Sequence, residues 1–564
     1  MIGKIIPSVK QQRRLDPHGR LKFQLRSFHT DWNANVDFFR YTRGRFVSNE
    51  EHEMAIRHVR FNMTELARLA AESVGCSLAQ CARIEKFPDG MFNKCFLFIM
   101  QDGREVVGKV PNPNAGRAHY TTASEVATMD FVRNELCTPV PKVLAWSSRA
   151  NKTPVGAEYI IMEKVAGVQL NELWPKLDIR DKFAVVKAIT GFQKAWMSTS
   201  FTPYGSLYYA SDLGSNDSCI LVKPNGSEVK EHRFAVGPST GREFLDDGRI
   251  ALDFDRGPWN SAEQYKLAVG LREIFCVREM DQLPRSPLSL YGPGTYSPSR
   301  PKKIAALQNY LRLVKYLLPL ERSFSSVCLW HPDLHAENIF VNPKKPSEVL
   351  GIIDWQSCEV LPLFDHARQP YFLDYDGPLT GLDPPTFPEN FDQLDAAEQA
   401  AAQSLYLQMS LSALYRRFLF TNNKPLFDAM EFRWSTSFEL MLLAQNLLVD
   451  GGALYRSRLL DLEKEWPSLP GVQAAGIPSI PFHFCTDEAN LIEQDAAGAI
   501  KAMELMQRLK RSLGQLWPEK GVVQPDQHDE VKNHLNKAKM EIFDRLALSH
   551  ADQTAWNKSW PFDG

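Results

Sequence analysis

The order of apolar and polar positions predicts a first part of the chain built from strands and two helices. A helix is predicted over residues 61–74, where the apolar residues fall near one stripe at helical spacing and Gly75 then supplies a stop. Three β-rich runs follow, at 82–87, 94–101 and 104–110. Asp102-Gly103 between the last two runs predicts a hairpin, because such a turn needs a positive φ.

A second helix, a short buried strand and then a long helical part follow. Residues 120–136 carry apolar residues at the spacing of one buried helix face, and residues 158–163 are predicted to form a strand. From Leu170 onward the pattern becomes mostly helical. The helical patterns of this second part cover 302–320, 395–420, 427–450 and 487–514.

Residues 204–300 interrupt the helical part. They are rich in Gly, Pro and Asp and contain a predicted hairpin at 220–236. We interpret this segment as an insertion that could cover a site. The chain then divides into a tail (1–36), a first lobe (37–163), a second lobe with the insertion (164–515) and a polar, weakly periodic extension (516–564).

Length and composition are those of a globular protein with more than one lobe. The chain has 564 residues, 44% of them hydrophobic and 23% charged, and its net charge is −2. This balance does not indicate bulk nucleic-acid binding, and we find no apolar run long enough to span a bilayer. The nine cysteines form no CxxC and fit neither a zinc ribbon nor a disulfide framework, so reduced thiols are expected.

The first 30 residues are strongly basic. They contain one acid, Asp16, against the basic residues Lys4, Lys10, Arg13, Arg14, Arg20, Lys22 and Arg26. An Arg-rich, acid-poor start is typical of mitochondrial transit peptides, and no apolar run follows that would indicate a secretory signal. A disordered basic tail explains the same composition, so both interpretations stay open.

The stretch LWHPDLHAENIFVN (329–342) places histidines, acids and an amide inside an apolar frame. One hypothesis is a metal site, because His331 and His335 are four residues apart and would share one face of a helix, as in many zinc sites. Pro332 and the strand-like runs on both sides argue against a helix, and no third ligand stands out. A zinc site is therefore the weaker hypothesis.

The stronger hypothesis is phosphoryl transfer. Asp333 precedes Asn338 by five residues, and a second acid, Asp354, ends a β-branched run. A carboxylate can orient an acceptor hydroxyl and take its proton, and Mg²⁺ prefers oxygen ligands such as an Asn amide and an Asp carboxylate. The structural alternative is a turn-capping Asp333, a loop amide at 338 and an acid at a strand end at 354. For His331 we favour packing and hydrogen bonding within the loop over a chemical role.

Phosphoryl transfer also requires a cation for the nucleotide. Lys109 lies on the predicted strand 104–110, and Glu125 lies on the predicted helix 120–136. A strand lysine held by a helical glutamate is a known arrangement in kinases. Two alternatives compete: Thr122 and Glu125 fit a capping box, and Lys109 fits a solvated position on an edge strand.

Two further segments could contact a nucleotide. FPDGMFNK (87–94) joins two predicted strands and lacks the G-x-G-x-x-G pattern of a phosphate-covering loop; its candidate contacts are Gly90, Met91, Phe92 and Asn93. MEKVAG (162–167) lies where a hinge would offer groups to adenine, through Glu163 and Val165. A plain linker between lobes explains this second segment nearly as well.

These residues resemble the aminoglycoside phosphotransferase and choline kinase-like family. HPDLHAENIF and GIIDWQ are similar to its catalytic and metal loops, and the likeness extends over roughly residues 37–450. Within the family it is strongest to a group of fungal mitochondrial proteins. Asp354 is followed by Trp-Gln in place of Phe-Gly, which departs from protein kinases and agrees with small-molecule kinases.

The resemblance implies an α+β, protein-kinase-like fold, with a nucleotide-binding N-lobe made of a small antiparallel sheet and one helix, and a large, mainly helical C-lobe. It implies ATP and Mg²⁺ as cofactors, Asp333 as catalytic base, Asn338 and Asp354 as metal ligands, and Lys109 with Glu125 as the phosphate-orienting pair. We expect transfer to a hydroxyl of a small molecule that the sequence does not identify, and a mitochondrial location that agrees with the basic tail. The alternative is a pseudokinase-like binding or scaffold protein without turnover.

Overall fold

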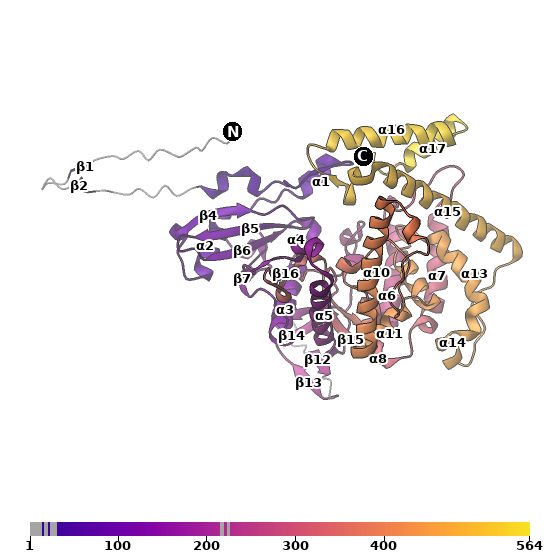
Figure 1. Ribbon diagram of the computed structural model, residues 1–564, viewed down its shortest axis with the longest axis horizontal. Coiled ribbons are helices and arrows are strands. Elements are labelled where there is room, and N and C mark those ends of the chain that lie inside the picture. Colours follow the sequence, from indigo (N-terminus) through magenta and orange to yellow (C-terminus); the bar gives the residue numbers. More distant parts are fainter. Residues whose placement is uncertain (1–13, 16–20, 23–30, 215–218, 223–225, 564) are drawn as a thin grey trace.

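The computed structural model describes residues 14–15, 21–22, 31–214, 219–222 and 226–563. Most of the predicted basic tail at 1–36, and with it the transit-peptide hypothesis, lies outside these residues. A strand-rich part and a helix-rich part lie side by side (Figure 1). This is the two-lobed α+β arrangement that the sequence predicts, and we call the two parts the N-lobe and the C-lobe.

The N-lobe is built on a five-stranded antiparallel sheet. Its strand order is β4 (Cys81–Lys86), β5 (Asn93–Met100), β6 (Glu105–Pro111), β8 (Tyr159–Glu163) and β7 (Val143–Ser147). Helix α2 (Met63–Ser73) covers one face, whose core includes Phe96, Phe98, Val106 and Val110. Because side chains alternate along a strand, Lys109 belongs to the opposite face. The sequence pattern does not predict β7, which is half-buried along its length at the sheet edge and has no alternation.

Helix α3 (Tyr120–Asn134) forms where the sequence predicts it. It packs against β7, β8 and β11 (Ser206–Tyr209), and most of its side chains are buried. His119 is the residue that precedes its first turn, so Thr122 lies inside the helix and the capping box with Glu125 does not form. That alternative is wrong, and the Glu125 carboxylate is left for another partner.

The C-lobe is mainly helical and encloses the largest apolar core, which includes Trp196, Trp330 and Trp355. Its longer helices are α5 (Ile179–Trp196), α6 (Ala262–Glu279), α7 (Arg300–Leu317), α10 (Ala396–Asn422), α13 (Gly452–Glu465) and α15 (Thr486–Leu513). Its shorter helices are α4 (Leu170–Leu173), α8 (Arg322–Ser325), α9 (Leu363–His366), α11 (Lys424–Phe432), α12 (Thr436–Gln445) and α14 (Pro470–Ala474). The pattern at 427–450 thus contains two helices, because Ser435 caps α12 by accepting from the Phe438 N–H.

The segment 204–300 contains more helix than its composition predicts. β12 (Cys219–Val222) and β13 (Glu228–Glu231) pair within the predicted hairpin, and β14 (Phe234–Gly237) pairs with β11. Helix α6, however, lies beside α7 in the C-lobe core and does not belong to a covering insertion. Its buried residues include Lys266, Arg272 and Glu273, which form ion pairs, and these charges hide the helical pattern in the sequence.

Short strands in the C-lobe fix two loops. β15 (Val327–Trp330) pairs with β18 (Glu359–Pro362), and β16 (Ile339–Asn342) lies between β9 (Val168–Gln169) and β17 (Lys345–Ile352). Residues 331–338 therefore connect β15 to β16, and residues 353–358 connect β17 to β18. Each loop is held by paired strands at both of its ends.

The C-terminal extension folds against the N-terminal region. Helices α16 (His528–Leu546) and α17 (His550–Ser559) share an apolar core with α15, and they lie together at the top of Figure 1. Strand β19 (Val522–Val523) pairs antiparallel with β3 (Arg45–Phe46), which precedes α1 (Glu50–Ile56). The sequence pattern is polar here because α16 buries only a narrow apolar stripe and exposes the rest of its surface.

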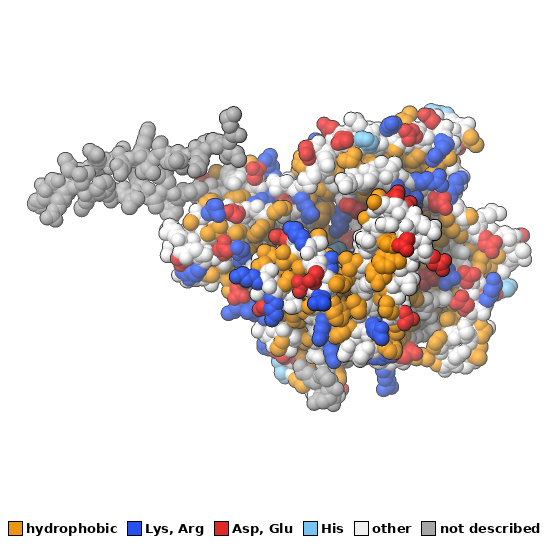
Figure 2. Space-filling view, viewed as in Figure 1, with side chains coloured by type: hydrophobic (Ala, Val, Ile, Leu, Met, Phe, Trp, Pro, Cys, Tyr) orange, Lys and Arg blue, Asp and Glu red, His pale blue; other side chains and the backbone are white. Residues whose placement is uncertain are grey.

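Charged side chains of both signs are interspersed over the face of the molecule shown in Figure 2. The cysteines whose side chains the structure describes are free thiols. Among the described helices, none has both the length and the hydropathy needed to cross a membrane.

Candidate functional site

Lys109 connects the two lobes at the centre of the candidate site. Its ammonium on β6 donates to both carboxylate oxygens of Glu125 on α3, at 2.7 and 2.9 Å. The same Nζ donates to Oδ1 of Asp354 in the C-lobe, at 2.9 Å. Lys109 is 5% exposed and Glu125 is 4% exposed. The alternative of a solvated edge-strand lysine is therefore wrong, and the sequence-predicted pair is present.

The Lys109 ammonium attracts both carboxylates, whereas the Asp354 charge disfavours the ionised form of Glu125. Burial disfavours the charged form of Lys109, but Asp354 and Glu125 outweigh it and raise the pKa of the lysine. Burial also acts on Asp354, yet the charge and hydrogen bond of Lys109 lower the pKa of this carboxyl. For Glu125 burial dominates and raises its pKa despite the lysine. When both carboxyls are ionised, two negative charges share one ammonium and leave an excess of negative charge.

Asp333 and Asn338 lie together in the loop between β15 and β16. The Asn338 Nδ2 donates to the backbone oxygen of Asp333 at 2.9 Å and lies 3.4 Å from its Oδ2. Oδ1 of Asp333 pairs with Nε2 of His335 at 3.0 Å, and the His335 ring stacks on Tyr371. The Asp333 side chain is half exposed. One oxygen of this carboxylate is thus held in place while its side chain stays accessible to a ligand.

His331 fixes this loop to the strand that ends at Asp354. Its Nδ1 accepts from the Asp333 N–H at 3.1 Å, so Nε2 carries the proton and donates to the Ile353 carbonyl at 2.9 Å. Burial lowers the pKa of His331 and keeps the imidazole neutral. Because both ring nitrogens of His331 form hydrogen bonds, this histidine is not free to bind zinc, and one of the two ligands of the zinc hypothesis is lost. The described part of the chain contains no group of three or more His, Cys, Asp or Glu side chains placed to hold a metal ion.

An unusual turn directs Asp354 toward Lys109. Asp354 and Ser357 have φ angles of 62° and 59°, in the left-handed region that residues other than glycine rarely adopt. Between them Trp355 is fully buried, and its Nε1 donates to the Ile352 carbonyl at 2.9 Å. The indole anchors the turn in the C-lobe core, which lets the backbone keep this conformation.

The residues present fit a magnesium ion. Oδ2 of Asp354 and Oδ1 of Asn338 have no hydrogen-bond partner among the described residues. A carboxylate oxygen and an amide oxygen are hard donors of the kind that Mg²⁺ prefers. When Glu125 and Asp354 are both ionised, the excess of negative charge around Lys109 adds electrostatic attraction for a divalent cation.

The loop 87–93 is attached to the rest of the site through its side chains. Asn93 Nδ2 donates at 2.7 Å to Oε1 of Gln356, two residues beyond Asp354. The Met91 carbonyl accepts from the Asn112 amide at 3.0 Å, and the Arg242 guanidinium lies 3.9 Å from the centre of the Phe92 ring. Since the side chains of Asn93 and Phe92 are engaged within the protein, a ligand contact at this loop would use its backbone.

In the predicted hinge segment, residues 162–167, the two predicted contact residues Glu163 and Val165 differ in their hydrogen bonding. The Glu163 N–H donates to the Lys142 carbonyl, and its carboxylate accepts from the Lys142 N–H, both at 3.0 Å. The side chain of Val165 packs against Gly351, and its N–H has no hydrogen-bond partner among the described residues. Val165 thus has a free backbone donor for a base, whereas the N–H and carboxylate of Glu163 are already used.

The sequence pattern does not identify three residues that contact the site: Asp89, Arg242 and Gln356. Asp89 is 1% exposed within the loop 87–93, and Gln356 also donates to the Ala115 carbonyl at 2.9 Å. Gln356 follows Asp354 in GIIDWQ, which is the one signal that could have indicated it. The other two depend on contacts between distant segments, and no local pattern indicates such contacts.

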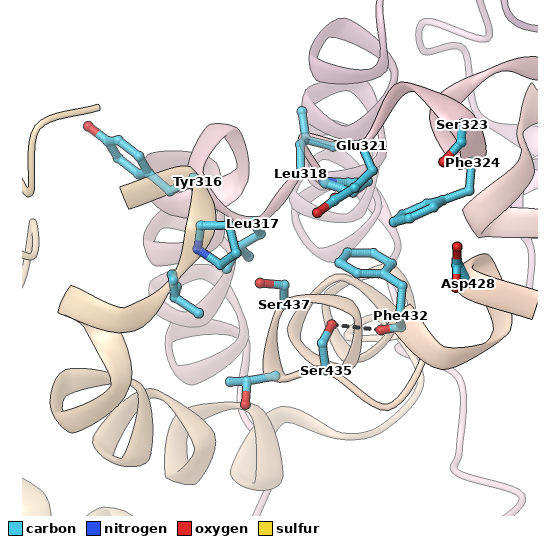
Figure 3. Close-up of a pocket in the computed structure, with 15 residues that line it drawn as sticks. Tyr316, Leu317, Leu318, Glu321, Ser323, Phe324, Asp428, Phe432, Ser435 and Ser437 are labelled. Carbon is cyan, nitrogen blue, oxygen red and sulfur yellow. Dashed lines mark hydrogen bonds between the residues drawn. The ribbon is translucent and has the colours of Figure 1, made fainter. Parts of the chain in front are cut away.

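Two cavities lie away from Lys109, Asp333 and Asp354. One of about 480 Å³ opens between the end of α7 and the α11–α12 region, where Phe324 and Phe432 face each other (Figure 3). Another of about 660 Å³ lies behind the hinge and is lined by residues 163–166 and Phe192. Neither cavity is lined by Lys109, Asp333 or Asp354. The candidate site is therefore distinct from both cavities.

Comparison with known proteins identifies the family. The model of the phosphotransferase enzyme family (APH) matches residues 83–368, half of the chain. The chain belongs to this family. The matched span contains Lys109, Glu125, Asp333, Asn338 and Asp354, so the phosphotransferase family assignment and the geometry refer to the same residues.

Relatives of this phosphotransferase-family chain include proteins that match over most of its length. The subtelomeric hrmA-associated cluster protein of Aspergillus fumigatus is 28% identical over 517 residues, which cover 86% of this chain and 97% of that protein. The altered inheritance of mitochondria protein 9 of Yarrowia lipolytica, named mitochondrial, is 24% identical over 499 residues, 84% of this chain and 83% of that protein. A solved structure of a putative aminoglycoside phosphotransferase from Ralstonia eutropha aligns with 78% of this chain and 99% of its own, at 13% identity and a TM-score of 0.36.

Proposed function

We propose that the protein transfers the γ-phosphoryl group of ATP to a hydroxyl group of a small molecule, with Mg²⁺ as the metal. The observation that carries this proposal is the junction of Lys109 with Glu125 and Asp354, where one buried ammonium joins the two lobes. In kinases a strand lysine held by a helical glutamate binds the nucleotide phosphates, next to a metal-binding aspartate. Asp333 and Asn338 in the neighbouring loop supply the remaining groups.

Each residue has a role that follows from its surroundings. Asp333, accessible and oriented by His335, accepts the proton of the acceptor hydroxyl. Lys109 offers its ammonium to the phosphate oxygens, and Glu125 keeps that ammonium in place. Asn338 and Asp354 would hold Mg²⁺, which neutralises charge on the phosphates when bound. Catalysis then consists mainly of positioning and of charge stabilisation.

The variant Asp333→Asn tests the base. It keeps the size of the side chain and its contact with Asn338 but removes the proton acceptor, so we expect kcat to fall by about 10²–10⁴-fold with little change in ATP affinity. A screen of metabolite hydroxyl compounds for ADP formation first identifies the acceptor, and titration calorimetry gives the affinity. Asp374→Asn, an exposed carboxylate paired with Arg368, is the matched control. An unchanged rate in Asp333→Asn would refute the assignment.

A binding or scaffold protein without turnover is the competing function. A thermal-shift titration with ATP and Mg²⁺ separates the two, because a ligand that binds only the native state raises the apparent stability. We expect a shift in the wild-type chain and its loss in Lys109→Ala. A shift together with ADP formation supports the transferase, and the absence of any shift supports the scaffold.

We also propose a mitochondrial location. The basic composition of residues 1–30 and the name of the Yarrowia lipolytica relative support it. Fluorescent fusions of the full chain and of a chain lacking residues 1–30 test it. We expect mitochondrial signal from the first and diffuse signal from the second, and diffuse signal from both would contradict the proposal.

A further inference from the structure

The loop 87–93 lacks the feature that usually shapes a phosphate-covering loop. Closely spaced glycines normally let such a backbone turn sharply and approach the phosphates. Here Gly90 is the one glycine, its φ is not in the positive range, and an added Cβ would make only ordinary contacts. The loop nevertheless has a fixed place beside Asp354, through the bond between Asn93 and Gln356. The contacts that fix this place are made by side chains.

Asp89 is the fixed point of this loop. Its buried Oδ2 accepts from the N–H and the hydroxyl of Thr42, at 2.8 and 2.9 Å, and from Nζ of Lys86 at 2.6 Å. Its Oδ1 accepts from Nζ of Lys94 at 3.3 Å. Four donors converge on one carboxylate, and removing it would leave two ammonium groups without their counter-charge.

The segment that carries Thr42 is itself anchored. We call residues 40–47 the N-terminal strap. The Arg40 carbonyl in this strap accepts from Lys86 and from Lys94, at 2.7 and 2.8 Å. Farther along, Gly44 lies so close to β19 that a Cβ would be 2.5 Å from the Val523 carbonyl oxygen. The strap therefore connects Asp89 to the C-terminal extension.

The end of the loop is held by the C-lobe. Asn93 is bonded to Gln356, and Phe92 lies against the Arg242 guanidinium. That guanidinium also donates to the Asn114 and Ala115 carbonyls, at 3.2 and 3.1 Å. The loop is thus fixed at its start by Asp89 and at its end by the C-lobe, and the short backbone between these points has little freedom to move.

We propose that Asp89 is the positioning residue of the loop 87–93. Its hydrogen bonds hold the backbone of residues 90–92 in place to contact the phosphates of ATP. This inference rests on the proposed function and deepens it, because it names what replaces the missing glycines. The surroundings of Lys94 agree with it. Burial lowers the pKa of Lys94 to about 8, and Asp89 is the group that opposes this effect, so loss of Asp89 also favours a neutral lysine.

Comparing ATP with adenosine tests the proposal, because adenosine lacks the phosphates that the loop would contact. The full chain is titrated calorimetrically with ATP plus Mg²⁺ and, separately, with adenosine. In Asp89→Asn we expect ATP affinity to fall by about tenfold or more while adenosine affinity stays within about twofold, since the loop and not the hinge is displaced. Asp102→Asn, an exposed carboxylate in the β5–β6 turn of the same sheet, is the matched control and should change neither affinity.

Thr42→Val is the milder second variant. It removes one donor to Asp89 and keeps the N–H, so we expect a smaller loss in the same direction, and it decides the question if Asp89→Asn does not fold. Equal losses for ATP and adenosine in the variants, or no loss for either, would overturn the positioning role. A wild-type chain that binds neither ligand would overturn the proposed function, and the inference with it. Wild-type binding with unchanged variants overturns the inference alone.

Discussion

At the scale of single residues, Lys109 is shared by two carboxylates that come from different lobes. Nζ is bonded to Glu125 and to Asp354 at the same time. In the proposed reaction the nucleotide phosphates would compete with Asp354 for the ammonium, and a divalent cation beside Asp354 would weaken that competition by neutralising the charge of the carboxylate. We propose that Glu125 keeps the Lys109 ammonium in place while the other partner of the lysine changes from Asp354 to a phosphate.

Glu125→Gln tests that task. The amide keeps the size of the side chain but removes the charge on α3, so that Lys109 pairs with Asp354 alone. We expect kcat/KM for ATP to fall by about 10²-fold, measured by ADP formation, because the lysine no longer points at the phosphates. The control is Glu135→Gln at the end of α3, whose carboxylate pairs with Arg233 near the surface. Equal efficiency of Glu125→Gln and the wild type would remove the ion pair from the mechanism.

His331 gives the stability of the protein a dependence on pH. Its pKa in the folded chain is lowered by burial, while the unfolded chain binds a proton to this histidine below about pH 6.5. The unfolded state therefore takes up more protons, and the free energy of unfolding should decrease as pH falls below that value. In His331→Gln this part of the decrease should disappear, as measured by urea denaturation between pH 5 and 8. Parallel curves for the two proteins would show that His331 does not titrate on unfolding.

Which site residues the sequence predicts depends on how local their signals are. Asp333, Asn338 and Asp354 lie within one short stretch, and Lys109 and Glu125 are placed by a strand and a helix that the pattern predicts. Asp89, by contrast, acts through Thr42, and Gln356 acts through Asn93 at a separation of 263 positions. Such contacts are made by the fold, so spacing along the chain carries no sign of them.

At the scale of elements, periodicity predicts the helices that bury few charged side chains and fails for α6, which buries several. Helices α2 and α3 and the strands β4 to β6 form within a few residues of their predicted positions. Helix α6 buries charged residues on the same side as apolar ones, because Arg249 and Arg272 both pair with Glu273. A pattern that assumes charges face water cannot identify such a helix.

Strand β18 carries a buried acid with an effect opposite to that of His331. Burial, together with Glu243, raises the pKa of Glu359 well above its usual value, while Ser239 donates to it. The folded chain therefore keeps a proton that the unfolded chain loses above about pH 4.5, and stability from this group decreases as pH rises. Glu359→Gln removes the titrating carboxyl and with it this loss of stability at high pH, and the amide of the glutamine can donate to Glu243. We expect the variant to be more stable than the wild type by about 1 kcal/mol or more at pH 8 and to lose this advantage near pH 4.5, in urea denaturation. A variant less stable at pH 8 would contradict the assignment.

At the scale of the whole molecule, the described residues form three larger apolar cores: one under the N-lobe sheet, one in the C-lobe, and one between α15, α16 and α17. The third core includes Val47, the last residue of the strap, as well as Trp556 and Trp560. Its stability therefore determines whether β19 is available to pair with β3, and so whether the strap keeps its position.

Trp556→Ala tests this link. The side chain is fully buried in the third core, and its removal should cost about 3–5 kcal/mol there. Hydrogen exchange should show earlier opening of residues 522–559 than of the C-lobe core, and ATP affinity should fall more than adenosine affinity because the strap loosens. Trp434→Ala, at a side chain that is 62% exposed, is the control and should leave both unchanged. Uniform opening of all three cores would show that the extension is not a separate unit.

The pairing of β3 with β19 has a consequence for how the protein is made. Arg45 and Phe46 leave the ribosome long before their partners Val522 and Val523, which follow only after both lobes have been synthesised. The N-lobe sheet and the bonds between Thr42 and Asp89 can form during translation, whereas the strap gains its pairing with β19 only after position 523 has been synthesised. A nascent chain stalled before position 522 would therefore contain all the residues of the candidate site and still lack the strand pairing that anchors the strap.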